Sequence, residues 1–277
     1  MSRLLPNWLV LFLLYQPVVC SAIATDTPAP DSLTGRLPAH AHNDYMQERP
    51  LIDALEHGFR SIEADVFLVG DSLFVAHDRK DIRPGRTLRA LYLLPLAEYL
   101  SEDTSTHPGT GPIILLVDIK DDGLSTYQLL DRILSEFRDI LCRVSPEGYV
   151  PGNAMVVISG NRPIDYMSRQ KERLAFVDGR LENLTDGTSP QLMPLISDRW
   201  TKYFSWNGEG HIPEKERMKL ELFVQQAHEK GRMIRFWATP DTPGMEREAV
   251  WSELLEAGAD LINTDDLDGL REFLNSR

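Results

Sequence analysis

A chain of 277 residues is about the length of a single (β/α)₈ barrel and can bury one large hydrophobic core. Its 42 acidic residues outnumber its 29 lysines and arginines, which gives a formal net charge of −13. This balance argues against a nucleic-acid partner, because phosphate contacts require clustered lysine and arginine and the sequence has no basic stripe.

The N-terminus has the pattern of a secretory signal. Arg3 precedes a short apolar run at residues 8–14, and residues 22–24 fit the A-x-A pattern of a signal-peptidase site. The apolar run is too short to span a bilayer as a mature helix, so a retained membrane anchor is the weaker interpretation. We expect residues 1–24 to be a signal peptide that is cleaved near Ala24, and the mature chain to be secreted or periplasmic.

Residues 25–36 are rich in proline, aspartate and serine, and we interpret them as a flexible tether ahead of a folded domain at residues 37–277. Lipid attachment at Cys20 is disfavoured, because the preceding Val19 is bulky for a lipoprotein signal. Removal of the signal would leave Cys142 as the only cysteine, so the sequence predicts no intramolecular disulfide.

Apolar β-type segments then alternate with amphipathic helical segments. This alternation predicts parallel strands joined by helices, and eight strands is the number of a TIM barrel, so the fold class is α/β with a single (β/α)₈ barrel. Strands are expected at residues 37–42, 60–68, 112–118, 153–159, 174–178, 192–197, 232–238 and 260–264. Helices are expected at residues 49–58, 87–100, 124–140, 163–171, 214–230, 245–257 and 267–275.

One segment interrupts this alternation after the second strand. Residues 67–75 are interpreted as an inserted β-hairpin, because the Gly-Asp pair at 70–71 supplies the positive φ of a tight turn. A two-residue loop would place His77 opposite Ala64, on the wrong face, whereas a three-residue loop would place it opposite Asp65. The sequence leaves this register open.

Three carboxylates are expected at one end of the barrel. Glu63 and Asp65 are two apart in one strand and therefore point to the same face, while Asp118 ends the apolar run at 113–117. Such close carboxylates would repel one another unless a cation lay between them. All-oxygen ligation favours a hard cation, so the sequence predicts Mg²⁺ or Ca²⁺ rather than zinc.

Two histidines, His42 and His77, each follow an apolar segment and are candidates for a general base and a general acid. The order of His42, an Ile-Glu-x-Asp-Val strand at 62–66 and a hairpin ending in His-Asp at 77–78 resembles the glycerophosphodiester phosphodiesterase and phosphatidylinositol-phospholipase-C-like superfamily. The combined pattern is specific, although each part alone would be weak.

The two ends of the folded domain carry further similarity to that superfamily. Residues 258–265, Gly-Ala-Asp-Leu-Ile-Asn-Thr-Asp, are similar to its C-terminal strand. The opening residues 42–45, followed by Arg-Pro at 49–50, resemble homologues of altered inheritance of mitochondria protein 6. Residues 125–230 are mostly unmatched.

The resemblance implies a metal-dependent phosphoric diester hydrolase. Carried over residue by residue, it implies that the metal ligands are Glu63, Asp65 and Asp118. It implies that His42 and His77 transfer protons and that Lys120 binds the phosphate.

One position departs from the family pattern. Many members have arginine directly after the first histidine, where it holds phosphate, but this chain has Asn43, which we expect to contact the substrate. The phosphate is therefore expected to rest on the cation, on Lys120 and on Arg235, with Trp237 as a wall of the pocket. The alcohols of the substrate are left open.

Two other classes of function remain as alternatives. The His-Ala-His at 40–42 matches the pattern that metal-dependent amidohydrolases place on their first strand, but the later strand ends lack the further histidines those enzymes need. An exported binding protein for a head group or sugar would not need two histidines placed for proton transfer. The expected partner is a small phosphodiester or phospholipid head group, with transient contact to a membrane surface, and the oligomeric state is left open.

Overall fold

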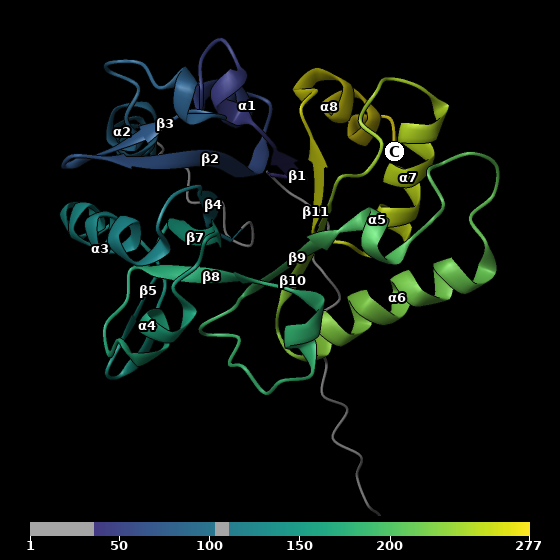
Figure 1. The fold of residues 1–277 in the computed structure, drawn as a ribbon. Helices are drawn as coiled ribbons and strands as arrows, with labels where there is room; N and C mark the ends of the chain where they lie inside the picture. Colours follow the sequence, from purple (N-terminus) through teal and green to yellow (C-terminus); the bar gives the residue numbers. More distant parts are fainter. Residues whose placement is uncertain (1–35, 103–110) are drawn as a thin grey trace, which may run out of the picture. The chain divides into compact units, whose positions relative to one another are not determined.

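The computed structural model describes residues 36–102 and 111–277, and a closed barrel of eight parallel strands organises them (Figure 1). The barrel strands are β1 (Leu37–Ala41), β2 (Phe59–Val69), β4 (Ile113–Ile119), β7 (Ala154–Gly160), β8 (Ala175–Gly179), β9 (Leu195–Arg199), β10 (Met233–Trp237) and β11 (Leu261–Thr264). They are hydrogen-bonded in this order, and β1 pairs in parallel with both β2 and β11, which closes the ring. The predicted TIM barrel is confirmed.

The continuous apolar runs of the strands follow from burial on both faces. In β4, Ile114 and Leu116 join an apolar cluster inside the barrel, whereas Ile113, Leu115 and Val117 pack into the larger core outside it. Successive strand side chains alternate between faces, so a strand enclosed by a ring of helices carries apolar residues at every position. A buried polar residue in such a strand therefore indicates the functional end of the barrel.

The helices lie around this barrel, close to where the sequence predicts them. They are α1 (Ile52–Glu56), α2 (Leu94–Glu102), α3 (Gly123–Leu134), α4 (Ile164–Arg169), α5 (Trp200–Tyr203), α6 (Glu214–Glu229), α7 (Met245–Glu256) and α8 (Leu267–Asn275). The largest differences are in α2, which begins at Leu94 rather than at residue 87 because a π-helical turn takes up the first part of the predicted helix, and in α3, which ends at Leu134 rather than at residue 140. The first helix begins at Ile52 because Leu51 has φ 68° and cannot continue a helix. Between β8 and β9 lies only the short 3₁₀ helix Leu181–Leu184.

Two short strands and the helix α5 have no counterpart in the sequence-based expectation, and a predicted helix is divided. Strands β5 (Arg143–Ser145) and β6 (Gly148–Val150) form a separate two-stranded sheet. A π-helical turn, Arg89–Leu93, precedes α2. Three-residue strands and single turns are too short to show an apolar periodicity, so pattern analysis does not detect them.

The inserted hairpin has the two-residue loop. Strand β3 (Ser72–Val75) pairs antiparallel with β2, with Val69 opposite Ser72 and Val66 opposite Val75. The inference that this loop would turn His77 to the wrong face is nevertheless wrong. Strand β3 ends at Val75, so the alternation of side chains between the two faces of a strand does not apply to His77. Its Nδ1 lies 3.6 Å from Asp65 Oδ2.

The predicted signal peptide at residues 1–24 and nearly all of the predicted tether lie outside the described residues. All described residues belong to one unit of the chain, Leu33–Arg277. Among them, no helix has both the length and the apolar composition needed to cross a membrane.

Candidate active site

The three carboxylates meet at the C-terminal mouth of the barrel. One carboxylate oxygen from each of Glu63, Asp65 and Asp118 lies within 4.8 Å of the others. The register explains this, because Asp65 and Asp118 are direct partners across the β2–β4 pair and Glu63 precedes Asp65 by two residues on the same face. The arrangement is the one that the sequence predicts.

A glycine makes room for this cluster. Gly160 ends β7 with φ 63°, and a Cβ atom there would lie 2.2 Å from Asp118 Oδ1. The left-handed backbone and the missing side chain are both required for the carboxylate to occupy its place.

Lys120 lies between two of the carboxylates. Its Nζ is 3.1 Å from Asp65 Oδ2 and 3.2 Å from Asp118 Oδ1. Burial opposes the charged ammonium, but these two carboxylates raise the pKa of Lys120. Burial raises the pKa of Asp65 to about 6, and the neighbouring Glu63 acts in the same direction. The cluster therefore has an excess of negative charge that one lysine does not neutralise.

Glu63 is fixed by a histidine from the neighbouring strand. His40 Nε2 donates to Glu63 Oε2 at 3.0 Å, and the hydroxyl of Ser61 lies 2.7 Å from His40 Nδ1. Complete burial lowers the pKa of His40 to about 3, so this histidine is neutral. Burial alone would raise the pKa of Glu63, but the hydrogen bond from His40 and the charge of Arg235 lower it to about 2. Glu63 is therefore ionised and held in one orientation.

Arg235 is buried in the same layer. Its NH1 lies 3.7 Å from Glu63 Oε2 and donates to Asn263 Oδ1 at 3.0 Å, while its Nε lies 3.3 Å from Ser197 Oγ. Three different strands thus hold the guanidinium beside the carboxylates. Figure 1 shows these strands, β9, β10 and β11, side by side in the barrel wall.

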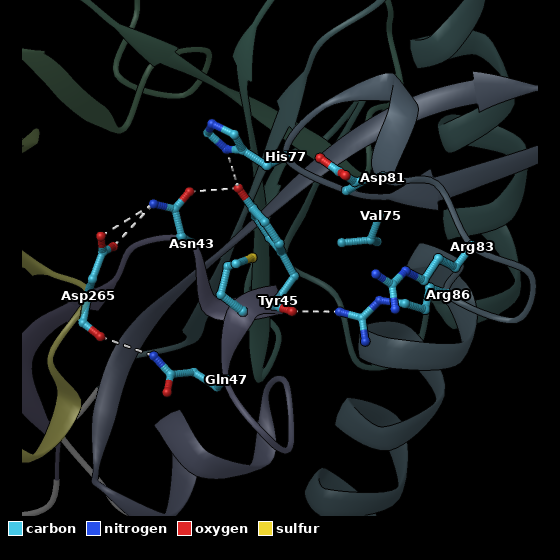
Figure 2. Close-up of a pocket in the computed structure, with 11 residues that line it drawn as sticks. Asn43, Tyr45, Gln47, Val75, His77, Asp81, Arg83, Arg86 and Asp265 are labelled. Carbon is cyan, nitrogen blue, oxygen red and sulfur yellow. Dashed lines mark hydrogen bonds between the residues drawn. The ribbon is translucent and has the colours of Figure 1, made fainter.

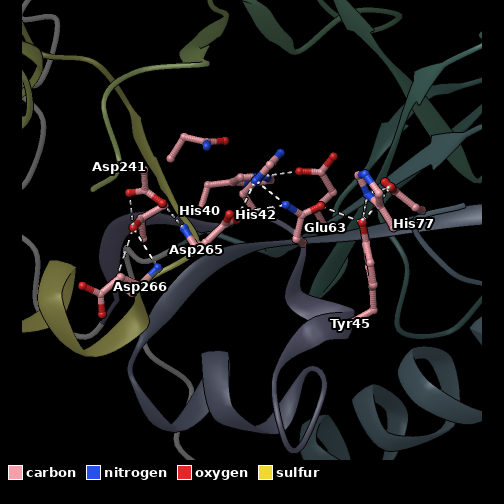
Figure 3. A network of polar contacts seen from close by, with 12 residues as sticks. His40, His42, Tyr45, Glu63, His77, Asp241, Asp265 and Asp266 are labelled. Carbon is pink, nitrogen blue, oxygen red and sulfur yellow. Dashed lines mark hydrogen bonds and ion pairs between the residues drawn. The ribbon is translucent and has the colours of Figure 1, made fainter. Parts of the chain in front are cut away.

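His42 is held by a residue from the other end of the chain. Its Nδ1 lies 2.6 Å from Asp265 Oδ1 (Figure 3), and Asn43 Nδ2 donates to the same oxygen at 3.2 Å (Figure 2). Asn43 adopts a left-handed backbone, with φ 48°, which turns its amide back toward this pair. Burial lowers the pKa of His42, but the hydrogen bond with Asp265 and the charge of Glu63 together raise it.

Tyr45 joins the two histidine neighbourhoods. Its buried hydroxyl lies 2.6 Å from Asn43 Oδ1 and 3.0 Å from His77 Nδ1 (Figure 2), and 2.8 Å from Asp65 Oδ2. A hydroxyl has one proton to donate, so it donates to one of the two oxygens and accepts from His77 Nδ1–H. Burial and the charge of Asp65 raise the pKa of Tyr45, so the hydroxyl stays protonated.

These groups surround a cavity of about 320 Å³. We call it the carboxylate cavity, and its lining residues are His42, Glu63, Asp118, Lys120, Ser159, Gly160, Arg180, Arg235 and Trp237. Most of the predicted site residues line it, whereas Asn43 and His77 line an adjoining cavity.

The donor set fits a hard divalent cation. Three carboxylates converge, and Asp65 Oδ1 is buried without a hydrogen-bond partner in the described part of the chain. Buried carboxylate oxygens are ordinarily satisfied, so an unpaired oxygen on one carboxylate of this cluster is consistent with a cation ligand.

The AIM6-like phosphodiesterase domain matches residues 34–178, which is more than half of the chain. The chain belongs to this family. The glycerophosphoryl diester phosphodiesterase family matches residues 233–268. Both the N-terminal and the C-terminal part of the barrel sequence therefore match phosphodiesterase families. The resemblance expected from the sequence is confirmed.

Fungal relatives of the AIM6-like type align over most of the chain. An altered inheritance of mitochondria protein 6 homolog of Arthroderma benhamiae is 29% identical over 267 residues, covering 86% of this chain and 83% of that protein. Altered inheritance of mitochondria protein 6 of Eremothecium gossypii is 29% identical over 274 residues, covering 84% and 68%.

Two solved structures share the fold of this AIM6-like domain. A calcium-dependent phosphoinositol-specific phospholipase C from Pseudomonas has a TM-score of 0.52 at 13% identity, covering 81% of this chain and 87% of that chain. A glycerophosphoryl diester phosphodiesterase from Parabacteroides distasonis has the same score and identity, covering 88% of each chain. At this identity the likeness shows the barrel fold alone.

Several polar groups of the AIM6-like site were not assigned roles from the sequence. Tyr45 and Asp265 both belong to the motifs that carried the resemblance, but neither has a spacing that indicates a contact with a histidine. Ser197 and Asn263 are buried polar residues at inward positions of apolar strands, and that interruption was the available signal. His40, the first histidine of the His-Ala-His pattern, lies beside the cluster, because its Nε2 bonds Glu63.

Proposed function

We propose that this chain is a divalent-cation-dependent phosphodiesterase that hydrolyses a small glycerophosphodiester or a phospholipid-head-group diester. The observation that carries the proposal is the convergence of three carboxylates within 4.8 Å at a mouth that also holds His42 and His77. Family membership supports the phosphodiesterase class, and the roles of individual residues are part of the proposal.

Glu63, Asp65 and Asp118 would hold the cation, which is Mg²⁺ or Ca²⁺ because all the donors are carboxylate oxygens. When bound, such an ion would neutralise charge on the phosphate and polarise its oxygens. Asp241, the carboxylate in residues 235–241, does not belong to this three-carboxylate cluster of the described residues.

Lys120 and Arg235 would bind the phosphate. Both line the carboxylate cavity, and both already lie within 4 Å of a carboxylate that would turn to the cation. A phosphodiester gains negative charge as it is attacked, so fixed cationic side chains stabilise that change. Asn43, whose amide is engaged with Asp265, would orient His42, and Trp237 would form a wall of the cavity.

The histidines would move the protons. The carboxylate of Asp265 accepts from His42 Nδ1–H, so a neutral His42 has its lone pair at Nε2, and this side chain lines the cavity. His77 is likewise held through Nδ1 by Tyr45, which leaves its Nε2 to exchange a proton with the substrate. One histidine would activate the attacking oxygen and the other would protonate the leaving oxygen.

The amidohydrolase alternative is disfavoured by His40. Both of its ring nitrogens are engaged, one with Ser61 and one with Glu63, and the side chain is fully buried. The His-Ala-His pair therefore does not present two free imidazoles to one metal ion, as that class requires.

We also propose that the mature protein is exported, with transient contact to a membrane surface. The export proposal rests on the signal-like sequence at residues 1–24, and the contact on the head-group type of substrate. N-terminal sequencing of the protein secreted by its source would test export, since an intact Met1 would contradict it.

The function is tested with purified chain and a panel of phosphodiesters, with phosphorus NMR of the products. Chelation should abolish turnover, and Mg²⁺ or Ca²⁺ should restore it. Asp118→Asn should remove the metal response, whereas Asp121→Asn, which lies beyond the strand and pairs with Arg79, should retain it. Turnover that persists in excess chelator would contradict the proposal, and binding without turnover of any diester would favour the binding-protein alternative.

A further inference from the structure

A second and larger cavity adjoins the carboxylate cavity. Its volume is about 710 Å³, and it shares no lining residue with the first (Figure 2). We call it the His77 pocket and define it by Tyr45, Met46, His77, Asp81, Arg83 and Arg86. Its volume is within the range of about 300–1,000 Å³ that is usual for small-molecule sites.

Residues that line the two cavities contact each other at the groups proposed to transfer protons. His77 lines the pocket, while its Nδ1 lies 3.6 Å from Asp65 Oδ2 of the carboxylate cluster. Asp265 also lines the pocket and bonds His42, which lines the other cavity. A molecule reaching from one cavity into the other would therefore pass directly beside the histidines and carboxylates.

We propose that the His77 pocket binds one alcohol of the phosphodiester, and that this alcohol carries an anionic group, either a carboxylate or a phosphate. This inference rests on the proposed phosphodiesterase function and deepens it by naming a substrate class. A phosphodiester joins two alcohols through one phosphorus, so a phosphate held at the carboxylate cluster needs room on two sides. The two adjoining cavities supply that room.

The positive charge of the pocket is the reason for expecting an anionic group on the bound alcohol. Arg83 and Arg86 line the same end of it, although the chain as a whole has a net charge of −13 (Figure 2). Arg86 NH2 donates to the carbonyl oxygen of Tyr45 at 2.5 Å, which anchors the side chain and leaves other N–H donors. The exposed guanidinium of Arg83 has no hydrogen-bond or ion-pair partner in the described part of the chain.

The acidic residues of the pocket do not cancel this preference. Asp81 is the one carboxylate that lines the pocket near the two arginines, and the structure records no ion pair between it and Arg83. Asp265 lies toward the opposite end, where His42 and Asn43 engage it. The arginine end therefore retains an excess of positive charge, and guanidinium groups bind carboxylate and phosphate through paired hydrogen bonds.

Apolar residues form one part of the wall. Val75 and Ala76 are buried at the end of the hairpin, and Met46 is 73% exposed at the rim. Such a surface suits the carbon skeleton between the phosphate and the distal anionic group. The alcohol in this pocket would be bonded to the ester oxygen nearest His77.

The inference is tested with three glycerophosphodiesters that differ in the second alcohol, which is glycerol, glycerate or glycerol phosphate. Wild-type kcat/KM should be highest for one of the charged alcohols, and which one it is identifies the anionic group. Arg83→Gln should lower kcat/KM for that substrate by about tenfold while leaving the glycerol compound unchanged. Arg79→Gln is the matched control, because Arg79 follows the same hairpin but pairs with Asp121 outside the pocket.

Equal rates for all three substrates, or equal losses for all three in Arg83→Gln, would overturn the inference while leaving the phosphodiesterase function intact. Failure of wild type to hydrolyse any diester would instead contradict the function. The pocket is then judged by calorimetric titration with the glycerol phosphate compound. Binding that Arg83→Gln weakens and Arg79→Gln retains would support the pocket, and the absence of binding would reject it.

Discussion

His42 Nδ1 lies 2.6 Å from Asp265 Oδ1, and the two residues are 223 positions apart in the sequence. They meet because β1 and β11 pair in parallel at the point where the barrel closes, with Ala41 opposite Thr264. Each side chain follows directly after its strand, so closure of the barrel creates the contact. A carboxylate at Nδ1 fixes the orientation and tautomer of the ring, and it stabilises the protonated form.

Asp265→Asn should lower kcat by about 10- to 1,000-fold, since a misoriented or wrongly protonated imidazole transfers protons poorly. The hydrogen bond with Asp265 raises the pKa of His42, so its loss should move the limb of the pH–rate profile that reports His42 to lower pH. Asp268→Asn is the control, because Asp268 is also a carboxylate paired with a histidine, here His57 Nε2 at 2.8 Å, but neither residue lines either cavity. An unchanged profile in Asp265→Asn would separate Asp265 from the chemistry.

Tyr45→Phe should lower kcat by about 10- to 100-fold, because it removes hydrogen bonds to Asp65 and His77 that involve a charged group. The ring stays in place, so circular dichroism and the thermal midpoint should change little. Tyr127→Phe removes an equally buried hydroxyl, which bonds Gln170 away from the site, and it should retain full activity. Equal activity of the two variants would show that Tyr45 has only a packing role.

Gly160→Ala should abolish the metal response and most of the activity. The new methyl group would lie 2.2 Å from Asp118 Oδ1, so the carboxylate or β7 must move. Gly231→Ala is the control for backbone strain, since Gly231 has φ 65° against 63° for Gly160 and no atom within 4 Å of the added Cβ. Thermal unfolding and Ca²⁺ titration of both variants separate the two effects. A normal metal response in Gly160→Ala would show that the site adapts to the added methyl group.

Asp44 should make the protein less stable as the pH rises. Burial raises the pKa of Asp44 to about 7, so between about pH 4 and pH 7 the folded state binds more protons than the unfolded state. Its contribution to the unfolding free energy therefore falls through that window, by up to about 4 kcal/mol. Asp44→Asn does not titrate and can still accept from Leu51 N–H and the Tyr92 hydroxyl, so its stability relative to wild type should rise with pH.

Asp122→Asn is the control of opposite sign. The hydrogen bonds from Ser125 lower the pKa of Asp122, so its contribution is present above its ordinary pKa and is lost as the pH falls below it. Urea unfolding from about pH 2 to pH 8 measures both variants, because the contribution of Asp122 changes only below about pH 4. A constant stability difference between wild type and Asp44→Asn would contradict the raised pKa.

The pattern of apolar residues was sufficient to predict the barrel. Each strand is buried on both faces and is a continuous apolar run, whereas each helix is buried on one face and has apolar residues at helical spacing, and both patterns are visible within a short segment. The same local rule placed Glu63 and Asp65 on one face, and the end of an apolar run placed Asp118 at the same mouth. His77 shows where that rule stops. The hairpin has the two-residue loop, but the strand ends at Val75 and the chain then turns freely, which strand alternation does not describe.

The sequence by itself thus determined the fold class, the family resemblance and the three clustered carboxylates. Only the tertiary structure decided the bonds of His42 with Asp265, the position of Tyr45 between Asp65 and His77, and the arginine-lined cavity beside them. The physical reason is that spacing within one strand fixes the direction of side chains, whereas contacts between distant segments depend on strand register, barrel closure and the path of loops.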